Sequence, residues 1–157
     1  MGMVTKKESA ATKPDIQKGL SKLVAGGNVL YVKLHNFHWN VKGPNFFTLH
    51  VKFQEFYEEV TLMLDEIAER MLAIGQQPPA TMKEYLELSS IKEAKGGEDP
   101  SMMIEALADD FQSCVDEMKE MAEAAEEEGD LSTHDLLVGW TEKLQKHIWM
   151  LEAYLGK

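Results

Sequence analysis

Cysteine is almost absent from this sequence, which has one, Cys114, in 157 residues. A single cysteine cannot form an internal disulfide and fits a reducing compartment, and its helical spacing marks it as a small core residue. Long apolar runs are also missing: no window approaches about twenty uninterrupted apolar residues, which excludes a membrane-spanning helix. Residues 1–15 have no apolar core after their lysines, so we expect no export signal and a cytoplasmic protein.

Positive charge is scarce as well. Lys and Arg number 16 against 27 Asp and Glu, which gives a net charge of −11. This charge argues against a general attraction to DNA phosphates and suits solubility or the gathering of cations. Residues 1–22 are the exception, because lysines outnumber Glu8 and Asp15 there. Two interpretations stay open for them: a basic arm that touches DNA, and a solvated tail, which the few lysines before Pro14 favour.

The alternation typical of β-strands is almost absent, and apolar residues recur at helical spacing instead. Four long helical segments are expected, over residues 14–42, 45–74, 100–128 and 132–155. Asn45 is the expected N-cap of the second segment, and Ser132 with Asp135 is expected to cap the fourth. Gly26 and Gly27 cost the first segment about 1 kcal/mol each relative to alanine, so a close approach of another helix is the expected reason for them.

A long connection, residues 76–100, separates the second and third segments. It contains Pro78-Pro79, Gly96-Gly97 and a short helix opened by residues 81–84, which have capping-box spacing. Such a length implies a crossover rather than a tight hairpin. The expected fold is therefore all-α, a ferritin-like four-helix bundle with a short helix in the long crossover. The expected domains are a flexible N-terminal tail, residues 1–13, and the bundle, residues 14–157.

Candidate metal ligands gather in residues 35–70. This stretch holds three of the 5 histidines, His35, His38 and His50, followed by Asp65 and Glu69. Imidazole and carboxylate together suit iron, whereas calcium and magnesium prefer oxygen and structural zinc prefers cysteine. The alternative is that each residue is surface or satisfied core, with the carboxylates on a solvated helix face.

Spacing predicts where such a site would lie. Asp65 and Glu69 are four residues apart and share one helix face. His50 precedes Asp65 by fifteen residues, which is roughly 60° around a helix but about 22 Å along it. No single ion spans that distance, so one site would need a second, antiparallel copy of the helix, with two equivalent sites per dimer. His38 would join His50 from the preceding helix.

The sequence also lacks any Glu-x-x-His pair, the motif with which ordinary ferritin-like bundles hold two irons inside one chain. This absence independently moves the predicted site to an interface between chains.

Three runs, HNFHWNVKGPNFFTLH, LDEIAERMLAIGQQP and KHIWMLEAYLGK, closely resemble the Dps-type miniferritins, and the similarity spans nearly the whole chain. The resemblance implies a hollow homododecameric cage that oxidises Fe(II), preferably with hydrogen peroxide rather than O2, and stores the ferric product. It implies a ferroxidase centre at the dimer interface, in which His38 and His50 of one subunit meet Asp65 and Glu69 of its partner. Asp65 would bridge the irons, and Glu69 would anchor the tighter one.

One position departs from the family pattern. The family usually has Asp or Glu four residues after the second histidine, where this chain has Gln54 followed by Glu55. Of two irons per centre, the second is therefore expected to be held weakly, through water, or by a shifted Glu55. Trp39 and Tyr57 are expected near the site, where they would shield radicals or simply pack between helices.

The resemblance places a threefold pore around residues 125–135. Asp135, with Asp130 or Glu126, is a candidate for its acidic funnel, and the alternative is that these are helix-end charges around Gly129. His134 and His147 are not expected to be ligands, and His35 does not match a family ligand position.

The function expected is a ferroxidase cage for iron storage and detoxification. Two-electron reduction of peroxide at paired irons would avoid hydroxyl radical and so protect DNA. The alternative is a nucleoid-associated cage that mainly compacts DNA and has a weakened metal site because of Gln54.

Overall fold

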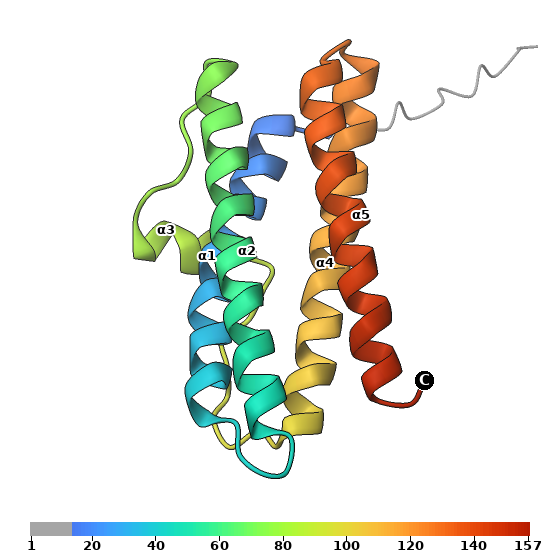
Figure 1. Ribbon diagram of the computed structural model, residues 1–157. Coiled ribbons are helices and arrows are strands. Elements are labelled where there is room, and N and C mark those ends of the chain that lie inside the picture. Colours follow the sequence, from blue (N-terminus) through green and yellow to red (C-terminus); the bar gives the residue numbers. More distant parts are fainter. Residues whose placement is uncertain (1–13) are drawn as a thin grey trace, which may run out of the picture.

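The computed structural model describes residues 14–157, which form five helices and no strand (Figure 1). The helices are α1 (Ile16–Asn40), α2 (Phe46–Ala73), α3 (Met82–Leu88), α4 (Pro100–Glu127) and α5 (Leu131–Tyr154). The predicted four-helix bundle, with its short helix in the crossover, is confirmed. The predicted tail, residues 1–13, lies outside the described residues.

The long helices pack as two pairs around one core. Figure 1 shows α1 beside α2 and α4 beside α5, and the crossover that carries α3 passes over α1 to reach α4. None of the helices in the described range is long and apolar enough to cross a membrane. The largest fully buried side chains come from α1, α2 and α4: Phe37, Phe53, Phe111, Leu20, Leu23, Leu30, Leu34, Met63, Ile67, Met71, Met103 and Ile104.

The start of α5 corrects one prediction. The cap is Asp130, whose carboxylate accepts a hydrogen bond from the Thr133 backbone N–H at 3.1 Å, so the prediction of Ser132 with Asp135 is wrong. Gly129, at φ +79°, reverses the chain in one step, and α5 therefore begins at once. Asn45 does precede α2, but its side chain donates to the Tyr154 hydroxyl at 2.8 Å instead of capping the helix.

The paired glycines of α1 behave as predicted at Gly27. A Cβ built there would lie 3.0 Å from the Leu64 Cβ, so the absence of a side chain lets α1 and α2 approach closely. At Gly26 the nearest atom to such a Cβ would be the Ile91 Cγ1, at 3.4 Å. The close approach therefore lies next to Asp65, in the second half of α2.

Polar pairs join α2 to α5 along their length. The Glu59 carboxylate hydrogen-bonds the His147 imidazole, and the Trp140 indole N–H donates to Glu66 at 2.7 Å. A further pair, Lys33 and Asp110, joins α1 to α4 at 2.7 Å in a largely buried position. Burial raises the pKa of Asp110, and the Lys33 ammonium opposes this shift.

Candidate metal centre

His38 and His50 are brought together by the turn between α1 and α2. Gly43, at φ +111°, lets the chain reverse between the two helices, and the Val41 N–H closes α1 by donating to the Phe37 carbonyl. His38 therefore comes level with His50, and the two ring centroids are 3.7 Å apart with nearly parallel planes, 13° between them. We call this pair the histidine half-site.

Each imidazole of the histidine half-site is hydrogen-bonded to the backbone of the other. The His38 Nδ1 is 2.6 Å from the His50 carbonyl oxygen, and the His50 Nδ1 is 2.7 Å from the His38 carbonyl oxygen. A carbonyl can only accept, so both Nδ1 atoms carry the hydrogen. In the neutral rings the Nε2 lone pairs are then free, which is the tautomer that binds a metal through Nε2 while Nδ1–H stays hydrogen-bonded to a backbone carbonyl.

Aromatic rings enclose the histidine half-site. Phe46 lies on the outer face of His50 at 5.0 Å with a 20° interplanar angle, and Tyr57 meets His38 edge to face at 5.4 Å. The His38 side chain is consequently buried, with 6% exposure. Phe46 was not predicted as part of the site. Its spacing of four residues before His50 on a helix was the available signal.

Asp65 and Glu69 lie on the same uninterrupted helix but far from the histidines. We call them the carboxylate half-site; α2 runs without a break from Phe46 to Ala73, so about 22 Å of helix separates His50 from Asp65. Both carboxylates are exposed and form no hydrogen bond or ion pair within residues 14–157. The described part of one chain has no cluster of three or more His, Cys, Asp or Glu able to hold a metal ion.

Between the half-sites, α2 exposes a polar strip. Gln54, one turn after His50, donates its amide to Glu58 at 2.9 Å, and Glu55 is paired with Lys52. Glu55 therefore has a cation beside it already, which makes it a poor substitute for the carboxylate expected at position 54.

The other three histidines each have a partner of their own. His147 packs on Phe56 at 5.0 Å and contacts Glu59, and the His134 Nδ1 is 3.0 Å from Asp135. The His35 Nδ1–H donates to the Tyr31 carbonyl at 2.9 Å.

The turn between α4 and α5 is closed by Asp130. Arg70 donates to the Asp130 carboxylate at 2.8 Å and to the Thr133 hydroxyl at 2.9 Å. Burial works in the opposite direction, but the hydrogen bonds from Thr133 and Arg70 together hold the pKa of Asp130 below its usual value. Asp130 thus has the helix-end role, and Asp135 and Glu126 are the exposed acids of the predicted funnel. Because Arg70 turns to Asp130, it leaves Glu69 unneutralised.

Comparisons with known proteins point to one family. A family model described as a ferritin-like domain matches residues 17–157. The chain is 54% identical over 138 residues to a DNA protection during starvation protein 2 of Bacillus anthracis, which covers 88% of the chain and 94% of that relative. It is 52% identical over 136 residues to a DNA protection during starvation protein of Brevibacillus brevis, covering 87% of the chain and 91% of the relative.

Solved structures give the same result. A crystal structure of Dps from Staphylococcus aureus superposes with a TM-score of 0.88 at 44% identity, covering 93% of this chain and 98% of that one. A Dps protein from Bacillus brevis superposes with a TM-score of 0.87 at 49% identity, covering 92% and 99% of the two chains.

Proposed function

Because the chain belongs to the Dps group of the ferritin-like family, we propose that its two half-sites form an iron-oxidising centre completed by a second copy of the chain. The observation that carries this proposal is the contrast between the histidine half-site and the carboxylate half-site. Two imidazoles are held with their Nε2 atoms free, and two carboxylates stand without partners about 22 Å away. A twofold axis near Glu58, midway along this interval, would set each histidine half-site against the partner's carboxylate half-site.

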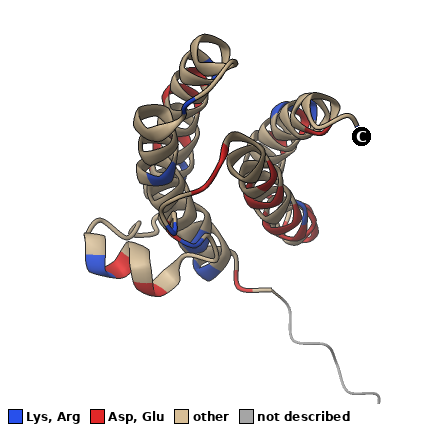
Figure 2. Cartoon of the chain, turned by 90° about the horizontal axis from the view of Figure 1, so that it is seen from below, with Lys and Arg blue, Asp and Glu red and all other residues tan. Residues whose placement is uncertain are grey.

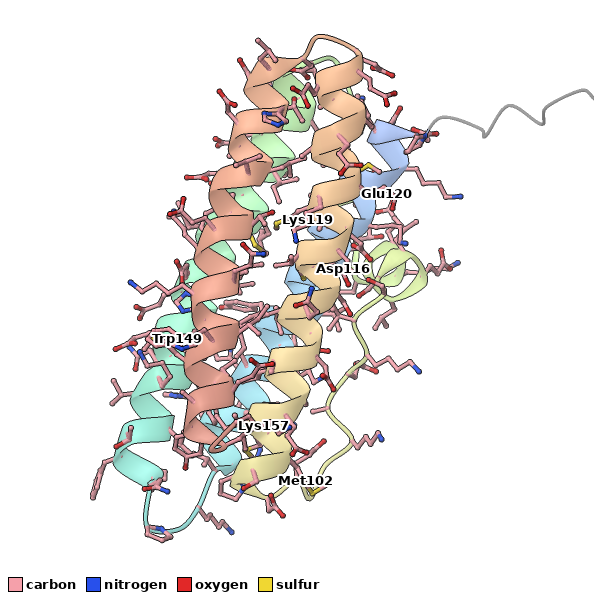
Figure 3. All side chains as sticks on the ribbon, turned by 90° about the vertical axis from the view of Figure 1, so that its right-hand side faces the viewer. Met102, Asp116, Lys119, Glu120, Trp149 and Lys157 are labelled. Atoms are coloured by element: carbon pink, nitrogen blue, oxygen red, sulfur yellow. The ribbon has the colours of Figure 1, made fainter. Side chains whose placement is uncertain are left out.

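The surface character of the helices supports pairing through α1 and α2. These helices expose large apolar side chains, Tyr31, Val32, Trp39 and Leu62, and Trp39 is 70% exposed. The outer side of α4 is polar instead: Figure 3 shows Asp116, Lys119 and Glu120 projecting from it, and Figure 2 shows acidic residues along this helix. A second copy would cover the apolar surface of α1 and α2 and leave the acidic surface in water.

The residue types fit Fe(II) as the substrate. Neutral imidazoles bind Fe(II), and anionic carboxylates stabilise the Fe(III) product. In the proposed reaction each of two Fe(II) ions gives one electron to hydrogen peroxide. The O–O bond breaks in a two-electron step, both oxygens leave as water or hydroxide, and no hydroxyl radical forms. Gln54, a neutral amide, would hold the second iron weakly.

The family and the charge extend the proposal to storage. We place the centre in a cytoplasmic dodecamer that collects ferric mineral, and the net charge of −11 favours the gathering of Fe(II). Relatives are named for DNA protection. In this chain we assign that protection to the removal of Fe(II) and peroxide, because the same charge disfavours DNA compaction. A salt-sensitive shift of DNA mobility by the full chain, lost on removing residues 1–13, would restore the compaction alternative.

A complementation experiment tests the shared centre. One variant carries His38→Ala with His50→Ala, and the other carries Asp65→Asn with Glu69→Gln. Each alone should lose peroxide-driven Fe(II) oxidation, whereas subunits dissociated and reassembled at equal ratio should regain about a quarter of the wild-type rate, because random pairing leaves one centre in four intact. A His134→Ala variant is the matched control and should keep the wild-type rate. No recovery in the mixture would place the centre within one chain or remove it.

A further inference from the structure

We infer that Tyr57 and His35, which the proposed function leaves without a role, are positioning residues that hold His38 ready for metal. This inference rests on the proposed function, because it concerns the orientation of one of its iron ligands. Its starting point is the arrangement of rings: Tyr57 contacts His38, and His35 contacts Tyr57.

Tyr57 limits the movement of the His38 ring. The Tyr57 ring stands at 89° to the His38 ring, with centroids 5.4 Å apart, while His50 covers a face of His38 at 3.7 Å. The hydrogen bond to the His50 carbonyl fixes His38 through one nitrogen only. Rotation about the Cβ–Cγ bond would turn Nε2 toward the wrong side, and the Tyr57 ring occupies space that such rotation needs.

His35 holds Tyr57 in turn. The two rings are stacked face to face, with centroids 3.9 Å apart and 18° between the planes. His35 is itself held between aromatic rings, because the ring centroids of Tyr31 and Trp39 lie 4.5 and 5.2 Å from its own, and its Nδ1–H also donates to the Tyr31 carbonyl. His35 therefore acts on the centre through the ring of Tyr57, and it has no ring contact or hydrogen bond with His38 or His50.

This arrangement separates the three histidines of the stretch by role. His38 and His50 exchange hydrogen bonds with each other's backbone and have free Nε2 atoms, as ligands require. His35 bonds only within its own helix and stacks on a tyrosine. A ring of similar shape without nitrogen should therefore replace His35, whereas no such replacement can serve for His38.

Cobalt binding by the assembled protein tests the inference. Co(II) accepts the same nitrogen and oxygen ligands, and its visible absorption bands report their geometry. Four variants form two matched pairs: His35→Phe with His35→Ala, and Tyr57→Phe with Tyr57→Leu. The phenylalanine variants keep the flat ring and should bind Co(II) like the wild type with unchanged bands. The other two should bind about three- to tenfold more weakly and show altered bands.

The outcomes distinguish this inference from the proposed function. If His38→Ala with His50→Ala binds Co(II) as tightly as the wild type, the proposed function fails. If that variant loses binding but His35→Ala and Tyr57→Leu bind normally, only the positioning role is overturned. His35→Phe binding as weakly as His35→Ala would also overturn it, since His35 would then act through a nitrogen. Thermal melting and light scattering confirm folding and assembly of each variant, and the tyrosine pair gives the result should His35→Ala not assemble.

Discussion

The two ends of α2 are built on opposite principles. At the amino end the His50 ring is hydrogen-bonded through Nδ1, stacked on His38 and covered by Phe46. Toward the carboxyl end, Asp65 and Glu69 are exposed and have no partner within residues 14–157. The fold of a single chain thus orders the two imidazoles but leaves the two carboxylates exposed to water and available to a metal ion or a second chain.

This difference indicates which half is costly to order. A neutral imidazole has two nitrogens and must present the correct one, which requires a fixed tautomer and a fixed ring plane. A carboxylate accepts from many directions and is strongly hydrated, so burying it without a metal or a cation would be unfavourable. In the proposed centre, half-sites of this kind would let a single chain stay stable without metal and would restrict oxidation to the assembled form.

The largest effect on iron oxidation should come from removing the negative charges of the carboxylate half-site. Asp65→Asn with Glu69→Gln should lower the rate of peroxide-driven Fe(II) oxidation by about a hundredfold or more, because both anionic ligands are lost. The melting temperature of the metal-free protein should not fall, since these side chains have no partners to lose. Stopped-flow absorbance and calorimetry measure the two quantities. A fall of several degrees would show that the carboxylates already have a structural role.

A gain of function should follow from Gln54→Glu. The substitution puts a carboxylate one turn after His50, where the Dps family usually has one, and should tighten binding of the second iron about tenfold. Anaerobic Fe(II) titration followed by calorimetry would show two strong sites per centre instead of one. Glu55→Gln is the control and should leave the titration unchanged, because Lys52 already pairs with that residue. An unchanged titration for Gln54→Glu would mean that position 54 does not reach the metal.

The distance between α1 and α2 beside the carboxylate half-site can be changed at Gly27. Gly27→Ala should destabilise the protein by about 1–2 kcal/mol, because its Cβ would lie 3.0 Å from the Leu64 Cβ and push α2 away beside Asp65. Gly26→Ala is the matched control and should be neutral or stabilising, since its Cβ would lie 3.4 Å from the Ile91 Cγ1 and 3.8 Å from the Ser89 Oγ, and alanine favours a helix. Urea unfolding of both variants provides the comparison. Equal free energies of unfolding would show that the close approach of α1 and α2 at Gly27 does not affect stability.

The smallest effect is the pH dependence of stability at the turn between α4 and α5, where Arg70 pairs with Asp130 and not with Glu69. The pKa of Asp130 is lowered in the folded protein, so its stabilising contribution is fully present above its usual value of 3.8 and is lost as pH falls through the lower folded value. Asp130→Asn should therefore lower the melting temperature slightly at pH 6 and converge with the wild type once the pH has fallen below the folded pKa of Asp130. Asp135→Asn, at an exposed acid, should follow the wild type throughout. A constant difference at all pH values would mean that Asp130 acts without its charge.

The fold was largely predictable from the sequence because its signals are local. Glycine and proline mark the ends of the long helices, and apolar residues repeat at helical spacing between them. The start of α5 was not predicted, because Ser132 and Asp130 both have side chains that can cap, and only the tight reversal at Gly129 decides between them.

The candidate residues follow from composition and spacing, but their local geometry does not. Residue type and spacing pointed to His38, His50, Asp65 and Glu69 and to the separation of His50 from Asp65 and Glu69 along one helix. The reciprocal hydrogen bonds of His38 and His50 depend on how α1 slides against α2, which no local pattern encodes. The contribution of Phe46 and the stack of His35 on Tyr57 depend on the same register.

The unbroken course of α2 from Phe46 to Ala73 limits how this chain can change in length. One residue inserted between His50 and Asp65 would turn Asp65 by about 100° and aim it away from the partner. Seven inserted residues, close to two full turns, would restore its direction but move it about 10 Å along the helix. Point substitutions can therefore accumulate within this interval, whereas insertions and deletions there should be strongly selected against.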